Sequence, residues 1–260
     1  MTAALDPFVA LANRLADAGG AIARRYFRTP IQVDDKADTS PVTVADREAE
    51  AAMRALIARE YPDHGVIGEE HGAERPGASW VWVLDPVDGT KAFISGRPLF
   101  GGLIALCRDG VPVLGVIDCP ALGERWVGVA GRPTTFQGRP ARTRTCPSLG
   151  LATLSATSPQ MFAGEDFARF ERVRRAVKLP IYGGDCHSYG LLAGGFIDLV
   201  IETGLKVYDW AALVPVIEGA GGLITDWRGR KLSLDAAGDV IAAGDPRAHA
   251  AAIAMLMNGN

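Results

Sequence analysis

The chain is poor in the residues that build zinc knuckles and disulfide scaffolds. Its four cysteines (Cys107, Cys119, Cys146 and Cys186) lie far apart without a C-x-x-C pair, and its four histidines are also scattered. We therefore expect free thiols in a reducing, cytoplasmic compartment. The first residues lack the basic and then apolar pattern of a signal peptide. No apolar run approaches the roughly 20 residues that cross a bilayer, so no membrane partner is expected.

An excess of positive charge is also missing. The formal net charge is −3, which leaves no broad basic surface for a nucleic-acid partner. The 260 residues suffice for one large domain, or two closely joined ones, with a sizeable core. Local acidic clusters are the remaining charge feature, and divalent cations are their natural partners.

Hydrophobic periodicity predicts two long helices near the N-terminus. Apolar residues recur at helical spacing over 8–26 and again over about 43–61, where Thr43 is the expected N-cap and Asp46 lies in the first turn. The polar residues 32–40 between them predict an exposed loop. Further apolar runs predict a largely antiparallel sheet, with strands at 66–67, 80–84, 100–107, 111–117 and 125–129 and a hairpin turn at Arg108-Asp109-Gly110.

Residues 131–147, rich in Arg, Thr, Pro and Gly, predict a boundary between two halves. Beyond it, strands alternate with helices: strands at 151–156, 196–201, 223–225 and 240–242, and helices at 167–177, at 188–193, from Asp209 and at 246–257. Such alternation is typical of α/β structure. We expect an N-terminal α+β half, 1–145, that carries most metal ligands, and a C-terminal α/β half, 146–260, that carries Asp209 and the substrate pocket.

The most informative segment is the apolar run from Trp80 that ends in Asp85-Pro86-Val87-Asp88-Gly89-Thr90. Pro86 fixes one backbone torsion and Gly89 permits an unusual one, so the turn is stiff. Asp85 and Asp88 can then face one cation, while the amides of Gly89 and Thr90 point at an anion. An ordinary Asp-Gly turn after a buried strand explains the same residues equally well.

Other acids stand in similar places. Glu69 and Glu70 follow an apolar run, Asp46 lies in a first helical turn, and Asp209 lies at a helix start. Each also has a plain structural explanation: a solvated turn for the glutamates, the helix dipole for Asp46 and an N-cap for Asp209. Their joint occurrence at strand ends and helix starts favours a functional site over separate structural roles, because rigid elements position site residues well.

These residues resemble the signatures of the inositol monophosphatase superfamily. The match includes Asp85-Pro86-Val87-Asp88-Gly89-Thr90, and its order and spacing hold over nearly the whole chain. The further matching segments are Pro41-Val42-Thr43 with Asp46, Gly68-Glu69-Glu70, Tyr208-Asp209 and Gly219-Ala220-Gly221-Gly222. Tyr208 departs from the tryptophan usual in the second signature, but the carboxylate after it is in place.

The resemblance implies a layered αβαβα sandwich (α+β and α/β), usually dimeric, that hydrolyses a small-molecule phosphate ester with Mg²⁺. Carried over by position, Glu69, Asp85 and the Val87 carbonyl would hold one Mg²⁺, and Asp85, Asp88 and Asp209 a second. The Gly89 and Thr90 amides would hold the phosphate. Asp46 and Thr90 would orient the attacking water. The partner implied for the chain itself is a second copy, as a homodimer.

Three features look like the histidinol-phosphatase branch of the superfamily: the segment 183–190, the run 91–96 and the Tyr208-Asp209 variant. Asp185 puts a carboxylate where inositol phosphatases usually have a small neutral residue. Histidinol carries an amine and an imidazole, so Asp185 and Glu202 are chemically suitable partners, and Tyr189 either stacks on the imidazole or packs. The resemblance thus implies hydrolysis of histidinol phosphate in histidine biosynthesis.

Two alternatives stay open at this point. The first is that the chain is an inositol monophosphatase or a related nucleotide or sugar phosphatase of the same superfamily. The phosphate esters of inositol, nucleotides and sugars all fit the motif. A fold relative that acts as a non-catalytic regulatory binding protein is the alternative of another class. The full set of carboxylates argues against that second reading, because a pure scaffold need not keep groups that repel one another.

Overall fold

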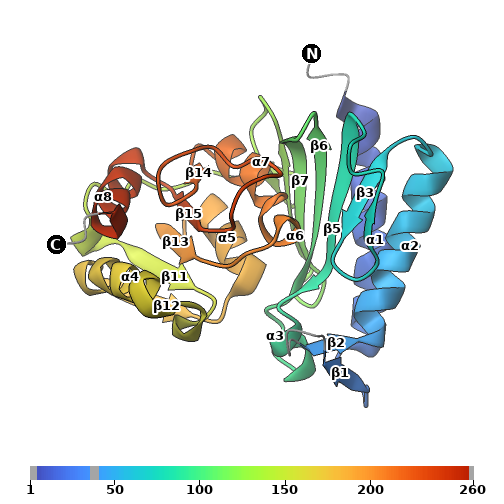
Figure 1. The fold of residues 1–260 in the computed structure, drawn as a ribbon, viewed down its shortest axis with the longest axis horizontal. Helices are drawn as coiled ribbons and strands as arrows, with labels where there is room; N and C mark the ends of the chain where they lie inside the picture. Colours follow the sequence, from blue (N-terminus) through green and yellow to red (C-terminus); the bar gives the residue numbers. More distant parts are fainter. Residues whose placement is uncertain (1–4, 36–40, 258–260) are drawn as a thin grey trace.

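The computed structural model describes residues 5–35 and 41–257, and its elements stack in five layers, αβαβα (Figure 1). Helices α1 (Asp6–Tyr26) and α2 (Val44–Glu60) cover the outer face of a large sheet. Helices α5 (Asp185–Ala193), α6 (Val207–Trp210) and α7 (Leu213–Gly219) form the middle layer. A smaller sheet follows, and α4 (Gly164–Ala176) and α8 (Pro246–Met257) cover its far face. The predicted layered sandwich is confirmed.

The large sheet has eight strands among the described residues, in the order β10-β9-β8-β7-β6-β5-β3-β4. All neighbours are antiparallel except β3 and β5. The strands are β3 (Gly65–Gly68), β4 (Gly72–Glu74), β5 (Trp80–Asp88), β6 (Gly101–Arg108), β7 (Val111–Cys119), β8 (Glu124–Val129), β9 (Thr135–Phe136) and β10 (Arg139–Pro140). Asp109 and Gly110 both have positive φ, 49° and 80°, as the predicted two-residue hairpin turn requires.

The small sheet is mixed, with strand order β12-β11-β13-β15-β14. Its parallel pairs, β11 with β12 and β11 with β13, are joined through α4 and α5 as in α/β folds. Its strands are β11 (Thr153–Ala156), β12 (Leu179–Tyr182), β13 (Leu199–Glu202), β14 (Leu223–Thr225) and β15 (Val240–Ala243). The shorter elements outside both sheets are β1 (Val33–Asp35), β2 (Pro41–Thr43), α3 (Thr90–Ile94), η2 (Leu149–Leu151) and η3 (Pro159–Met161).

Three sequence expectations were wrong in detail. Residues 33–35 of the predicted loop form β1, which pairs with β2, while 36–40 lie outside the described residues. Helix α5 begins at Asp185, three residues before the predicted start around Ser188, whereas α6 begins at Val207, near Asp209 as predicted. Strands β4, β9, β10 and β12 were missed because each has only two to four residues and no apolar alternation.

One apolar cluster joins the two sheets through the middle helices. It combines Trp126 of the large sheet and Val200 of the small sheet with Leu192 and Trp210, all at most 2% exposed.

The division into halves at 145/146 stays a prediction. Within the described residues, no helix combines the length and apolar character needed to traverse a bilayer.

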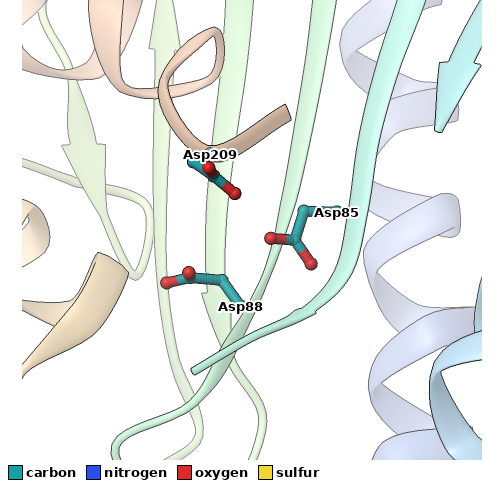
Figure 2. Close-up of side chains that lie close together, drawn as sticks. All are labelled: Asp85, Asp88 and Asp209. Atoms are coloured by element: carbon teal, nitrogen blue, oxygen red, sulfur yellow. The ribbon is translucent and has the colours of Figure 1, made fainter. Parts of the chain in front are cut away.

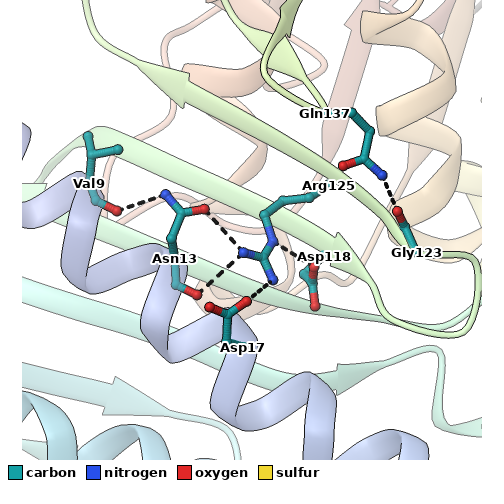
Figure 3. A network of polar contacts seen from close by, with 7 residues as sticks. All are labelled: Val9, Asn13, Asp17, Asp118, Gly123, Arg125 and Gln137. Carbon is teal, nitrogen blue, oxygen red and sulfur yellow. Dashed lines mark hydrogen bonds and ion pairs between the residues drawn. The ribbon is translucent and has the colours of Figure 1, made fainter.

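A polar network fastens α1 to the large sheet (Figure 3). Arg125 on β8 donates to Asp118 on β7 at 2.7 Å and to Asp17 on α1 at 2.8 Å. The same guanidinium also donates to the side-chain oxygen of Asn13 at 3.2 Å. Asp118 is only 6% exposed, and its burial would be costly without this partner. The outer helix layer therefore has a fixed register against β7 and β8.

Two glycines let the middle layer lie directly on the sheet. Gly115 of β7 and Gly128 of β8 are cross-strand partners. A Cβ on Gly115 would collide with the Ala212 carbonyl, and one on Gly128 would collide with the backbone of Pro215 and Val216. The backbone from Ala212 into α7 thus contacts the sheet without intervening side chains. This close approach sets the position of α6, which carries Asp209.

We predict that Gly115→Ala destabilises the protein, because the added methyl group must push the Ala212 backbone off the sheet. Such overpacking typically costs about 1–3 kcal/mol, which lowers the melting temperature by several degrees. Thermal unfolding followed by circular dichroism measures the effect. Gly77→Ala is the control, since a Cβ there meets open space. Equal melting temperatures for the two variants would contradict the close packing.

Candidate active site

Three carboxylates from distant parts of the chain meet between the large sheet and the middle helices (Figure 2). Asp85 and Asp88 lie at the end of β5, and Asp209 lies on α6. One oxygen from each is within 4.8 Å of the others. Asp85 is buried, and Asp88 and Asp209 are partly buried. The structure thus brings together three of the predicted metal ligands; that each is a ligand stays a prediction.

An irregularity in β5 aims two of these acids at the same space. Residues three apart on a regular strand point to opposite faces. Asp85 pairs with Leu103 of β6, but Asp88 pairs with Gly101, so β5 has one extra residue across this step. Such a bulge bends the strand and turns a side chain. The Val87 amide donates to Asp85 Oδ1 at 3.0 Å, which holds the bend from within.

The turn after β5 also has the predicted shape. Gly89 has φ 82°, a left-handed conformation that favours glycine, and it is the N-cap of α3. The Thr90 hydroxyl donates to the Val87 carbonyl at 3.1 Å. Gly89 and Thr90 both line the pocket described below. Their amides as phosphate ligands, and the Val87 carbonyl as a metal ligand, stay predictions.

Asp46 and Asp209 are held by the same type of local hydrogen bond, that of a capping box. Each is the third residue of its helix and accepts the backbone N–H of the N-cap residue, from Thr43 at 2.9 Å and from Lys206 at 2.6 Å. Thr43 is the N-cap of α2, as predicted. Asp209 is therefore not the N-cap of α6, and its structural role is that of the third residue in a capping box. This hydrogen bond fixes one carboxylate oxygen of each acid.

Glu69 follows β3 and lies beside this group. Its backbone N–H donates to the Leu84 carbonyl at 3.2 Å, and the charge of its carboxyl group helps to raise the pKa of Asp85. It does not belong to the close group of three, but it lines the same pocket as Asp88 and Asp209. Its role as a metal ligand stays a prediction, as does the role of Asp46 in orienting water.

Burial and mutual repulsion perturb these acids strongly. Burial, and then the charges of Glu69, Asp88 and Asp209, raise the pKa of Asp85 well above its ordinary value. Burial and the charges of Asp185 and Asp209 do the same to the pKa of Asp88. Burial raises the pKa of Asp209 to about 7. A donor set made only of clustered oxygens fits a hard divalent cation, which would remove the repulsion.

A pocket of about 290 Å³ opens from the carboxylates. Small-molecule sites typically begin near 300 Å³, so this pocket suits a small ligand. Glu69, Asp88 and Asp209 line this pocket, and so do Asp185 and Lys91. Burial raises the pKa of Asp185 to about 6, although the charges of Arg97 and Lys91 act in the opposite direction.

The three predicted substrate-binding residues, Asp185, Tyr189 and Glu202, differ in burial and in their hydrogen bonds. Both oxygens of Glu202 are engaged, one by the Thr157 amide at 2.8 Å and one by the Tyr189 hydroxyl at 2.9 Å. Tyr189 and Glu202 are 1% and 3% exposed. Asp185 is half-buried. All three line the pocket, and their contacts with a substrate stay predictions.

Two backbone contacts of this site were not expected from the sequence. The Cys186 amide, at the start of α5, donates to Asp88 Oδ2 at 2.6 Å, which ties the small-sheet side of the molecule to β5. The Thr157 amide holds Glu202. Both contribute backbone groups, and a backbone contact between distant segments leaves no trace in residue identity.

Comparison with known proteins gives a consistent result over the full length. The family model described as "Inositol monophosphatase family" matches residues 4–259. The bifunctional phosphatase IMPL2, chloroplastic, of Arabidopsis thaliana is 51% identical over 97% of this chain and 75% of its own length. A histidinol-phosphatase of Chlorobaculum parvum is 35% identical over 92% of this chain and 93% of its own. A solved structure of an inositol monophosphatase from Zymomonas mobilis has a TM-score of 0.91 and 50% identity, covering 98% of this chain and 99% of that one.

We predict that the metal-free protein loses stability as the pH rises from about 5 to 8. The folded-state pKa values of Asp185 and Asp209, about 6 and about 7, lie above those of an unfolded chain. The folded state therefore binds more protons in this window, and deprotonation costs stability. The pKa values of Glu171 and Asp245 are lowered by arginine partners, so their contribution is lost only at lower pH.

Melting temperatures in a chelating buffer at several pH values measure this slope. Asp209→Asn keeps an acceptor for the Lys206 amide but cannot ionise, so its slope should be flatter. Asp166→Asn, a partly exposed acid on α4 that does not line the pocket, is the control and should keep the wild-type slope. Burial lowers the pKa values of His64 and His249, which acts in the opposite direction in the wild type and in Asp209→Asn alike, so the comparison between the two slopes decides. Equal slopes for the metal-free wild type and Asp209→Asn would refute the assignment.

Proposed function

Because the chain belongs to the inositol monophosphatase family of phosphatases, we propose that it is a Mg²⁺-dependent phosphomonoesterase that hydrolyses histidinol phosphate to histidinol and phosphate. The general class, a phosphatase of this family, follows from the family match. The metal and the ester are the proposal. A place in histidine biosynthesis, a cytoplasmic location and a homodimer belong to the same proposal.

The observation that carries the choice of ester is the carboxylate of Asp185 in the pocket wall. It lies beside the turn that would hold the phosphate: a Cβ on Gly89 would be 3.1 Å from the Asp185 carboxyl carbon. Buried Glu202 adds negative charge to the same wall. A cationic alcohol gains from this charge, whereas a neutral polyol gains only hydrogen bonds and must desolvate the acid.

The chain's own residues supply the remaining chemistry. Glu69, Asp85, Asp88 and Asp209 would hold the cations, and the amides of Gly89 and Thr90 would orient the phosphoryl group. Bound divalent cations in such sites neutralise phosphate charge and lower the pKa of bound water. Asp46 and Thr90 would orient the water that attacks phosphorus. The bond from phosphorus to the alcohol oxygen breaks, and that oxygen takes up a proton.

The relatives support the reaction and leave two esters in competition. Relatives named histidinol-phosphatase are 35% and 37% identical, over 92% and 84% of this chain. The Zymomonas mobilis protein, named an inositol monophosphatase, is 50% identical. Hydrolysis of inositol 1-phosphate is therefore the second candidate, and the charge of Asp185 is what favours the first. A non-catalytic role is disfavoured because the repelling carboxylates are all retained.

We predict that Asp88→Asn abolishes turnover and leaves the fold intact. The amide oxygen of asparagine can still accept the Cys186 N–H, but the charge for a cation is lost. The fall in kcat should exceed the roughly 10–100-fold typical of residues that only support metal ligands. Phosphate release at saturating Mg²⁺ measures it, with Asp166→Asn as control. Near-normal turnover in Asp88→Asn would refute the metal assignment.

We predict a higher kcat/KM for histidinol phosphate than for inositol 1-phosphate in Mg²⁺. Asp185→Asn should lower kcat/KM for the first ester by about 10-fold or more, since a hydrogen bond to a charged group contributes about 1.5–3 kcal/mol. The value for inositol 1-phosphate should change little, so the second ester serves as the internal control. A clear wild-type preference for inositol 1-phosphate would reject the proposed substrate.

A further inference from the structure

A buried carboxylate outside the pocket binds the turn that carries Glu69. Glu50 of α2 is 0% exposed. Its Oε2 accepts the Glu70 amide at 2.6 Å, and its Oε1 accepts the His71 amide at 3.1 Å and the Arg54 guanidinium at 2.7 Å. Burying a carboxylate is costly unless hydrogen bonds compensate for lost water. Here the compensation comes mainly from the turn itself.

The turn is shaped around this carboxylate. Residues 69–71 connect β3 to β4, whose ends pair at Gly68 and Gly72. A Cβ on Gly68 would collide with the carboxyl group of Glu50, so only glycine leaves room for it there. Two successive turn amides directed at one carboxylate form an anion-binding arrangement. Arg54 completes the contact by donating to the Gly72 carbonyl.

The same helix also carries Asp46, one turn before Glu50. Glu69 is thus held from two sides: its own amide is bonded to the Leu84 carbonyl of β5, next to Asp85, and the two amides after it are bonded to α2. Glu50 therefore fixes the site's Glu69 relative to both β5 and Asp46.

From these contacts we infer that Glu50 is a positioning residue that sets Glu69 against Asp85 and thereby tunes cation binding. The inference rests on the proposed function, because it assigns Glu69 to a bound Mg²⁺. Glu50 touches no reacting atom and acts only through the turn. A purely structural role would affect the stability of α2 but not the affinity for the cation.

The experiment compares Glu50→Gln with Met53→Ala. Glutamine keeps the size of Glu50 but presents an amide nitrogen to a turn N–H. Met53 is 1% exposed on the same helix, packs against Gly19 of α1 and makes no polar contact through its side chain, so its truncation serves as the control for lost stability. Three quantities are measured: hydrogen exchange of the Glu70 and His71 amides without metal, the Mg²⁺-induced rise in melting temperature, and the Mg²⁺ concentration for half-maximal phosphate release.

We expect Glu50→Gln to speed exchange at Glu70 and His71, to reduce the Mg²⁺-induced rise, and to increase the half-maximal Mg²⁺ concentration by about 10–100-fold. Met53→Ala should lower the melting temperature but leave all three quantities near wild type. The inference is overturned if Glu50→Gln matches Met53→Ala in the Mg²⁺ measurements.

The wild type separates this inference from the proposed function. If Mg²⁺ raises its melting temperature but it hydrolyses no ester, the proposed function alone is overturned, because the Mg²⁺-induced rise still reports on Glu69. A wild type that Mg²⁺ does not stabilise would overturn both.

Discussion

Repulsion among desolvated carboxylates is the constraint on which this structure depends. Asp85, Asp88 and Asp209 have oxygens within 4.8 Å of one another, and burial together with the charges of neighbouring carboxylates raises their pKa values. Side chains free to move would separate. The fold keeps them together because it holds each acid by its own backbone donor, and every donor lies on a helix start or a strand bulge.

These donors come from different layers of the sandwich. Asp85 accepts from the Val87 amide within β5, Asp88 from the Cys186 amide of α5, and Asp209 from the Lys206 amide before α6. The cluster therefore lies where the large sheet meets the middle helices (Figures 1 and 2). The glycine pair that admits the α6–α7 backbone to the sheet, and the Arg125 network that fastens α1, stabilise the two sides of this junction.

The sequence predicts a structural feature when neighbouring residues determine it, and fails to predict it when distant segments do. The helix of Asp46 and its N-cap Thr43, the Asp109-Gly110 hairpin and the turn at Gly89 were predicted because capping and positive φ depend on neighbouring residues. The bulge in β5 and the amides of Cys186 and Thr157 were not, because they arise from pairing with distant strands. The meeting of Asp85 with Asp209 was inferred only from family resemblance.

Retention of this cluster is itself an argument for catalysis. In the absence of cations, each raised pKa means that the ionised site costs folding free energy near neutral pH. Replacing one acid by its amide would remove part of that cost and keep the backbone contact. A protein used only as a scaffold would gain stability from such a change. The unfavourable arrangement makes physical sense when a bound cation and a phosphate ester recover its cost during each turnover.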